Sequence, residues 1–196
     1  MNYKTLKAAA QFEFTEQRSK FIGFAAPVKD EASALKLLAD IKQTNKEATH
    51  NVYAYCVREN NTSRYSDDGE PHGTAGIPVL TVINGHEVTD CIIVVTRYFG
   101  GTLLGKGGLV KAYTEAAKGA LQAAGIAKMS LCDLLSVTAD YSFFEQIKNL
   151  ITEMGGIVKE TNFTDTVQII FLIDKSLTAD FFAELTELTG GSAQAE

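Results

Sequence analysis

The sequence predicts an α+β protein made of two domains, residues 1–130 and 131–196. Three observations support this prediction. The chain has 196 residues, 45% of them hydrophobic, which is enough for two small cores. Strand-like and helical patterns alternate along it. The charge changes near residue 130: residues 1–130 carry 15 Lys and Arg against 13 Asp and Glu, a net +2, whereas residues 131–196 carry 3 against 11, a net −8.

The first domain is expected to begin with strands over 11–15 and 20–28. A helix over 30–44 follows, because Asp30 suits an N-cap and apolar residues then recur at helical spacing. Alternation predicts a strand over 51–58, and residues 59–63 are expected to form a polar turn.

Residues 74–83 suit either a short helix or a strand, and we favour the helix because Pro78 is well placed in a first turn. A run rich in Ile and Val predicts a buried strand over 88–99. An apolar stripe predicts a helix over 108–124 that ends at Gly125.

The second domain is expected to contain a strand over 134–139, a helix over 143–154, a hairpin of 157–161 with 167–174, and a helix over 181–188. Ser142 and Glu145 predict a capping box at the start of the first of these helices. This order is that of a ferredoxin-like sandwich, although its usual fourth strand is hard to find in residues 192–196.

The sequence also indicates where in the cell the protein is expected. No apolar run approaches the roughly 18 residues that a membrane span needs, and the N-terminus lacks the apolar stretch of a secretory signal. Cys56, Cys91 and Cys132 show no C-x-x-C spacing, and Cys56 and Cys91 lie in apolar, strand-like runs, which favours buried, reduced thiols. We therefore expect a cytoplasmic protein without a membrane partner.

Two segments, residues 66–78 and 96–110, hold eight of the 16 glycines. Glycine clustered in this way indicates tight turns or close approach of the backbone to another group. Function is therefore expected at these segments, with candidate binding residues Asp67, Asp68, Gly69, Glu70, His72, Gly73, Thr74, Arg97, Tyr98, Gly100, Gly101, Gly105, Lys106, Gly107, Gly108 and Lys111.

The second segment is similar to a phosphate loop, since Gly100-x-x-x-x-Gly105-Lys106 follows a strand and precedes a helix. Gly107 stands where Ser or Thr would hold Mg²⁺, which disfavours nucleotide hydrolysis. Two interpretations stay open. The first residues of the helix bind an anion, with help from Lys106 and Lys111, or the glycines serve only a tight connection.

The acidic residues of the first segment, with His72 and the upstream His50, have the chemistry of a divalent-ion site or of a hydrolytic pair. The spacing matches no calcium loop, and no nucleophile elbow is present. A structured turn is favoured, in which Asp67 and Asp68 accept backbone N–H groups and Thr74 caps the next helix. No catalytic residue, metal or cofactor is expected.

Arg97 lies at the end of the predicted buried strand, where a charge needs a partner. We expect it to pair with Asp67 or Asp68 and so to join the two glycine segments. The alternative is that Arg97 faces a phosphate group of a ligand.

Together the two segments resemble the signature of the IMPACT/YigZ family in its bacterial two-domain form. The matching stretches are Asp67-Asp68-Gly69-Glu70-Pro71, Gly73-Thr74-Ala75-Gly76, Thr96-Arg97-Tyr98-Phe99-Gly100-Gly101, Leu104-Gly105 and Gly107-Gly108-Leu109-Val110, with Ser19-Lys20-Phe21 and Ala48-x-His50 similar to lesser motifs. Members often carry a small or polar residue at the position of Lys106, so this lysine is not a family feature.

The resemblance implies a first domain with a fold like the second domain of ribosomal protein five, and a ferredoxin-like second domain resembling domain five of elongation factor G. It implies a non-catalytic regulator of translation or stress response, because eukaryotic relatives bind the activator of the Gcn kinase under amino-acid stress. Bacteria lack that pathway, so a partner protein of the translation machinery is what carries over.

Two other functions stay open. One is RNA or ribosome binding through a basic face that would contain Lys20, Arg64, Arg97, Lys106 and Lys111. The other is an enzyme, such as a hydrolase, acting on a phosphorylated or acylated small molecule. A concave pocket with convergent polar groups would favour the enzyme.

Overall fold

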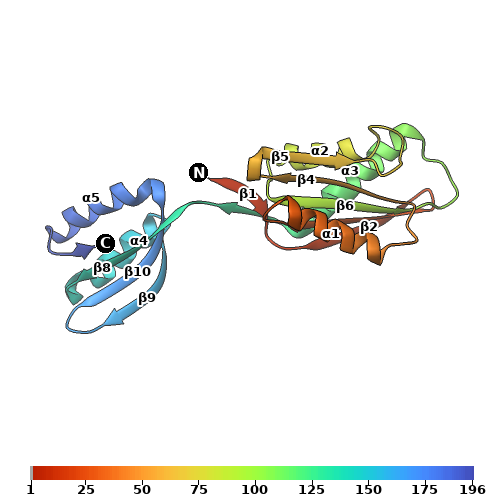
Figure 1. Ribbon diagram of the computed structural model, residues 1–196. Coiled ribbons are helices and arrows are strands. Elements are labelled where there is room, and N and C mark those ends of the chain that lie inside the picture. Colours follow the sequence, from red (N-terminus) through yellow and green to blue (C-terminus); the bar gives the residue numbers. More distant parts are fainter. Residues whose placement is uncertain (1) are drawn as a thin grey trace. The chain divides into compact units, whose positions relative to one another are not determined.

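The computed structural model describes residues 2–196 and divides into two compact units, Tyr3–Met129 and Ser130–Glu196 (Figure 1). Both mix helices with antiparallel sheet. Three clusters of buried apolar side chains form the cores, two in the first unit and one in the second. Each unit therefore has what it needs to fold around its own interior.

The first unit contains a five-stranded sheet in the order β2-β3-β6-β4-β5 and a two-stranded sheet of β1 and β7. Its elements are β1 (Tyr3–Leu6), β2 (Ala10–Glu16), β3 (Ser19–Pro27), α1 (Glu31–Thr44), β4 (His50–Val57), the 3₁₀ turn η1 (Glu59–Asn61), β5 (Thr62–Ser66), α2 (Gly76–Gly85), β6 (Cys91–Tyr98), α3 (Gly105–Ala124) and β7 (Ile126–Met129).

Helices cover both faces of the large sheet: α1 lies on one face, and α2 and α3 lie on the other (Figure 1). In the central strand β6, the residues from Cys91 to Val95 are all apolar and buried. Ile93 and Val95 enter the core under α2 and α3, whereas Ile92 and Val94 enter the core under α1. A strand that is buried on both faces has no polar side, as expected for the Ile- and Val-rich run.

The predicted helix starts are partly right. Asp30 caps α1, since its carboxylate accepts the Ser33 N–H at 2.7 Å and Ser33 Oγ accepts the Asp30 N–H at 3.2 Å. Residues 76–85 form a helix with Pro78 in its first turn, so the favoured alternative for this stretch is confirmed. The polar turn expected over 59–63 is wrong at its end, because β5 begins at Thr62 and pairs with β4.

The second unit has the order β-α-β-β-α-β, with a four-stranded sheet β11-β8-β10-β9. The elements are β8 (Cys132–Ala139), the 3₁₀ turn η2 (Tyr141–Phe143), α4 (Phe144–Glu153), β9 (Ile157–Phe163), β10 (Val167–Asp174), the 3₁₀ turn η3 (Lys175–Leu177), α5 (Thr178–Thr189) and β11 (Gln194–Ala195). The fourth strand that was hard to find is thus two residues long and pairs with β8.

The capping box predicted from Ser142 and Glu145 is wrong. Ser142 lies inside the turn η2, and α4 begins after Phe143 without a side-chain cap. The chain already winds helically at Tyr141, so Ser142 is not the extended residue that an N-cap requires.

Candidate functional site

A buried ion pair joins the two glycine segments. Arg97 Nη1 donates to Glu70 Oε1 at 2.6 Å, and the side chains of these residues are only 6% and 3% exposed. Tyr113 Oη donates to the same carboxylate oxygen at 2.7 Å. Burial first, and then this bond to Glu70, raise the pKa of Tyr113 above its usual range. The predicted junction of the segments is present, but Asp67 and Asp68 do not form it.

Both aspartates have other partners, which is why Arg97 pairs with Glu70. Asp67 accepts the N–H groups of Gly73, Ala75 and Gly76 at 2.8–3.1 Å. Burial alone would raise the pKa of Asp67, but these backbone donors outweigh burial and lower it. The carboxylate therefore sits at the start of α2 and caps it. Thr74 does not cap this helix, because its hydroxyl donates to the Pro71 carbonyl at 2.6 Å.

Asp68 fastens the same loop to the sheet and to α1. Its carboxylate accepts the Asn51 N–H at 2.7 Å and the Lys42 ammonium at 2.8 Å. Its carbonyl oxygen lies 2.7 Å from His50 Nδ1. Because a carbonyl only accepts, Nδ1 carries the hydrogen, and His50 Nε2 then faces Glu70 Oε2 at 3.9 Å. Sheet register makes this arrangement possible, since His50 and Phe21 lie directly opposite Arg97 on the neighbouring strands.

The loop after β6 is held close to the turn between β2 and β3. Ser19 Oγ accepts the Gly100 N–H at 3.2 Å and lies 3.4 Å from Arg97 Nη2. A Cβ added at Gly100 would lie 1.9 Å from the Arg18 carbonyl oxygen. Only glycine allows this approach, so its place in the motif has a packing reason.

These residues border a hollow of about 440 Å³, which we call the Arg97 hollow. Glu70, Arg97 and His50 supply its polar groups, and the start of α3 supplies Gly105 and Lys106. Phe99 and Leu103, at its edge, are 45% and 84% exposed. The remaining lining residues are Thr49, Gly69, Pro71, Leu104 and Leu109.

Other predicted site residues lie away from this hollow. The His72 side chain is 91% exposed, with its Nδ1 3.7 Å from Asp67. Tyr98 donates to Asn45 at 2.9 Å. Lys111 lines a separate hollow along α3. Gly101, Gly107 and Gly108 belong to the loop and the first turn of α3 but are not in the lining of the Arg97 hollow.

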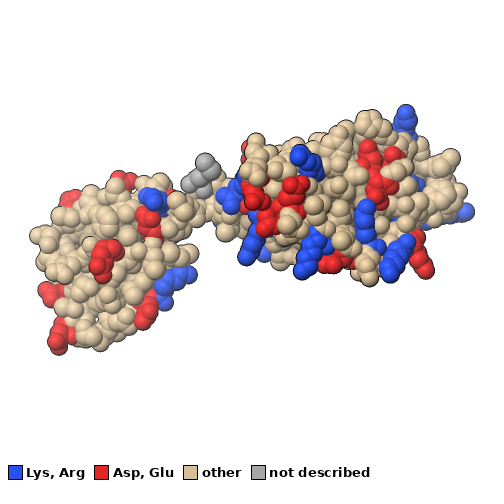
Figure 2. Space-filling view, in the orientation of Figure 1, with Lys and Arg blue, Asp and Glu red and all other residues tan. Residues whose placement is uncertain are grey.

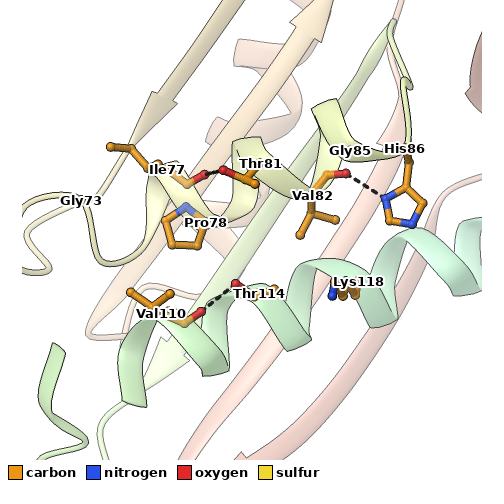
Figure 3. A pocket seen from close by; sticks show the side chains of 10 residues that line it. All are labelled: Gly73, Ile77, Pro78, Thr81, Val82, Gly85, His86, Val110, Thr114 and Lys118. Atoms are coloured by element: carbon orange, nitrogen blue, oxygen red, sulfur yellow. Dashed lines mark hydrogen bonds between the residues drawn. The ribbon is translucent and has the colours of Figure 1, made fainter. Parts of the chain in front are cut away.

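A second hollow, of about 410 Å³, lies between α2 and α3 (Figure 3). Its floor is apolar, and His86 and Lys118 stand at one end. The hydroxyls of Thr81 and Thr114 donate to carbonyls of their own helices, so they offer no free donor to a ligand. Gly73 is the only predicted binding residue in its lining.

Two residues of the possible basic face, Arg97 and Lys20, already have acidic partners. Arg97 is buried against Glu70, Lys20 pairs with Glu13 at 2.9 Å, and Lys106 and Lys111 line different hollows. On the side of the first unit shown in Figure 2, Lys and Arg atoms are interspersed with Asp and Glu atoms.

Among residues 2–196, no group of three or more His, Cys, Asp and Glu side chains is placed to hold a metal ion. No helix in the described part of the chain is both long and apolar enough to cross a membrane.

Sequence reasoning left four contributors out of the predicted site: Ser19, His50, Asn51 and Tyr113. Ser19 was visible only within a lesser motif, and His50 only there and as a possible partner of the acidic residues in a metal site or hydrolytic pair. Tyr113 falls on the apolar stripe of its helix, where a core position is the natural interpretation. Its hydroxyl meets Glu70 only because α3 packs over the sheet.

Comparison with known proteins gives the relatives of this chain. Residues 17–121 match the family model described as the Impact N-terminal domain, and residues 137–192 match a domain of unknown function, DUF1949. IMPACT family member YvyE of Bacillus subtilis (strain 168) is 35% identical over 193 residues, covering 98% of this chain and 89% of that protein. IMPACT family member YigZ of Escherichia coli (strain K12) is 29% identical over 181 residues, covering 91% and 89%.

Other relatives match a smaller part of this chain. Protein IMPACT of Rattus norvegicus is 35% identical over 95 residues, which are 46% of this chain and 30% of the rat protein. A solved structure described as that of a hypothetical protein is 27% identical, with a TM-score of 0.64 over 99% of this chain and 96% of that one.

Proposed function

Because this chain belongs to the IMPACT family, we propose that it is a cytoplasmic regulatory binding protein of translation or of the stress response, which docks a partner protein of the translation machinery at the Arg97 hollow. The observation that carries the proposal is the exposed apolar edge of this hollow. Phe99 and Leu103 are held beside it by a loop that Ser19 fixes at Gly100. Exposed apolar side chains that lie together beside a hollow mark a surface where a protein partner can bind.

The polar groups inside the hollow support binding more than turnover. Glu70 is engaged by Arg97 and Tyr113, so its charge is already balanced. The hydroxyl in the described lining, that of Thr49, accepts the Phe99 N–H at 3.0 Å and so helps to hold the loop after β6.

We also propose that residues 1–130 and 131–196 are separate domains, the first with a fold like the second domain of ribosomal protein five and the second ferredoxin-like, resembling domain five of elongation factor G. The β-α-β-β-α-β order and the sheet order β11-β8-β10-β9 support the second assignment. The separate family matches over 17–121 and 137–192 support the division.

The test is capture of partner proteins from a lysate of the source organism, before and after nuclease treatment. Leu103→Ser should lose the captured proteins of the translation machinery that wild type keeps after nuclease. Leu35→Ser is the matched control, because Leu35 is an exposed leucine, 46% accessible, on α1 and on the other face of the sheet. If nuclease or moderate salt releases everything from wild type, RNA is the partner instead.

A second candidate is an enzyme acting on a phosphorylated or acylated small molecule. The concave hollow favours it, since His50, Glu70 and Arg97 converge there. In the neutral imidazole with its hydrogen on Nδ1, His50 Nε2 has the lone pair that a general base needs. Turnover of such a compound by wild type, lost in His50→Gln while Leu103→Ser keeps it, would favour the enzyme over the docking protein.

A further inference from the structure

Gly107 has no role that packing within this chain explains. It lies in the first turn of α3, and a Cβ placed there would meet no atom within 4 Å. Its φ is not in the left-handed region, unlike Gly101 and Gly105 at +83° and +70°. Glycine in a helix costs roughly 1 kcal/mol relative to alanine. A glycine retained at this cost, with open space around it, is suited to close approach by a group from outside the chain.

The same turn is prepared for an anion. The residue before α3, Leu104, provides no side-chain hydrogen bond to the first N–H groups of the helix. The positive end of the helix dipole and these N–H groups together favour an oxyanion. Gly105 and Lys106, the first two residues of α3, line the Arg97 hollow, and Gly107 follows them directly, just outside that lining.

An independent observation comes from the interior of the hollow. Arg97 Nε is the one fully buried side-chain nitrogen or oxygen in the described part of the chain that lacks a hydrogen-bond partner. The other two guanidinium nitrogens are directed to Glu70 and, at the long distance of 3.4 Å, to Ser19. A buried charged donor without an acceptor is costly, and an acceptor oxygen bound in the hollow would remove this cost.

The charged residues of the hollow favour an anionic ligand. Arg97 and Glu70 balance each other, which leaves Lys106 as a cation with no ion pair among residues 2–196. The wall beside these donors is apolar, with Leu104 and Leu109 in the lining and Leu103 at the edge. A phosphate ion would contact only the hydrogen-bond donors. A carboxylate that carries an apolar side chain would contact both the donors and the apolar wall.

We infer that the Arg97 hollow captures the C-terminal carboxylate of a partner protein whose last residue is apolar. This inference rests on the proposed docking function and specifies the chemistry of its partner. The carboxylate lies at the first turn of α3, close to Gly107 and Lys106, with one oxygen toward Arg97 Nε. The terminal side chain packs against the leucines. Capture of a chain end by backbone N–H groups is an established mode of peptide recognition.

The test is a titration of the ¹⁵N-labelled full chain with N-acetyl-L-leucine, followed by the amide resonances of residues 105–108. These amides should shift saturably, with a Kd on the order of 1 mM for so small a ligand. N-acetyl-L-leucinamide, which has no carboxylate, and inorganic phosphate, which has no apolar group, should each bind at least ten-fold more weakly.

Variants separate recognition from stability. Gly107→Ala should raise the melting temperature and yet weaken N-acetyl-L-leucine about ten-fold or more, because the methyl group occupies the approach. Gly85→Ala is the matched control, since Gly85 is also a helical glycine with open space around it and lies in α2, not in the first turn of α3. It should leave the affinity unchanged. Lys106→Gln should weaken binding about three- to ten-fold.

Equal binding of the acid and the amide would overturn the inference, as would phosphate binding without acid binding, or unchanged affinity in Gly107→Ala. Each of these results leaves the capture experiment with Leu103→Ser unaffected. Retention of the partner proteins by Leu103→Ser would instead contradict the docking function itself.

Discussion

Arg97 and Glu70, 27 residues apart in the sequence, form an ion pair that is almost completely excluded from solvent, with 2.6 Å between Nη1 and Oε1. Phe21 and Phe99 lie about the guanidinium, with its carbon 5.5 Å and 5.4 Å from the ring centroids. The pair fixes the loop that carries Glu70 onto the end of strand β6. The candidate site depends on it, because it joins both halves of the hollow.

Arg97→Met should lower the free energy of unfolding by about 3–5 kcal/mol, because it leaves the Glu70 carboxylate buried without its counter-charge. Urea denaturation measures this loss. The double variant Arg97→Met/Glu70→Gln removes both charges and should recover part of it. If Arg97→Met alone were as stable as wild type, the buried Glu70 carboxylate would not depend on the guanidinium as its counter-charge.

Asp67→Ala should destabilise the protein by about 2 kcal/mol near neutral pH, because three backbone N–H groups lose their acceptor. The folded-state pKa of Asp67 is lowered, so its contribution is fully present above the unfolded-state pKa of about 3.9 and is lost as the pH falls through the lower folded-state pKa. The stability difference between wild type and variant should therefore be constant from about pH 5 to 7 and shrink below about pH 4.

Denaturation of both proteins across this range tests that prediction. Asp165→Ala, which changes an exposed aspartate of the second unit, is the control and should cost less than about 0.5 kcal/mol. A difference that grew on acidification would mean that the Asp67 carboxylate is strained in the folded state.

Gly100→Ala and Gly107→Ala should act in opposite directions although they lie in one segment. The first places a methyl group 1.9 Å from the Arg18 carbonyl oxygen and should cost about 3 kcal/mol or more. The second adds a methyl group in open space within a helix and should stabilise by up to about 1 kcal/mol. Thermal denaturation of both variants measures these two changes in stability. Equal effects would contradict the close contact between Gly100 and the Arg18 carbonyl oxygen.

One thiol should react rapidly with a disulfide reagent in the native protein, and three after unfolding in urea. Cys132 is exposed, whereas Cys56 and Cys91 are buried. Burial raises the pKa of both buried thiols, so their reactive thiolate forms are further suppressed. Cys132→Ser should abolish the fast phase; persistence of that phase would show that the sheet opens readily around Cys56 or Cys91.

The helices could be predicted from sequence because their signals are local. Asp30 and the apolar spacing after it define α1, and Pro78 correctly favoured a helix for the stretch with two interpretations. Strands β1 and β7 were not predicted. They are four residues each and exist by pairing Tyr3 with Met129 and Leu6 with Ile126, which no local pattern reveals. The same holds for β5, whose polar residues have the composition of a turn.

The candidate site was predicted as a region, and its internal connections were not. Glycine density and the family signature both indicated residues 66–78 and 96–110. The prediction that Asp67 or Asp68 would pair with Arg97 was wrong, because sequence alone does not rank three acidic residues so close together. Asp67 is committed to the start of α2 and Asp68 to Asn51 and Lys42, so Glu70 remains.

By itself, the sequence determined the elements with local periodicity, the change of charge near residue 130 and the family signature, because each is a property of residues close together along the chain. The tertiary structure alone decided that Tyr113, Ser19 and His50 surround one ion pair, and that Gly100 is required by contact while Gly107 is not. Those facts depend on how β3, β4, β6 and α3 pack, and the atoms involved lie up to 81 residues apart in sequence.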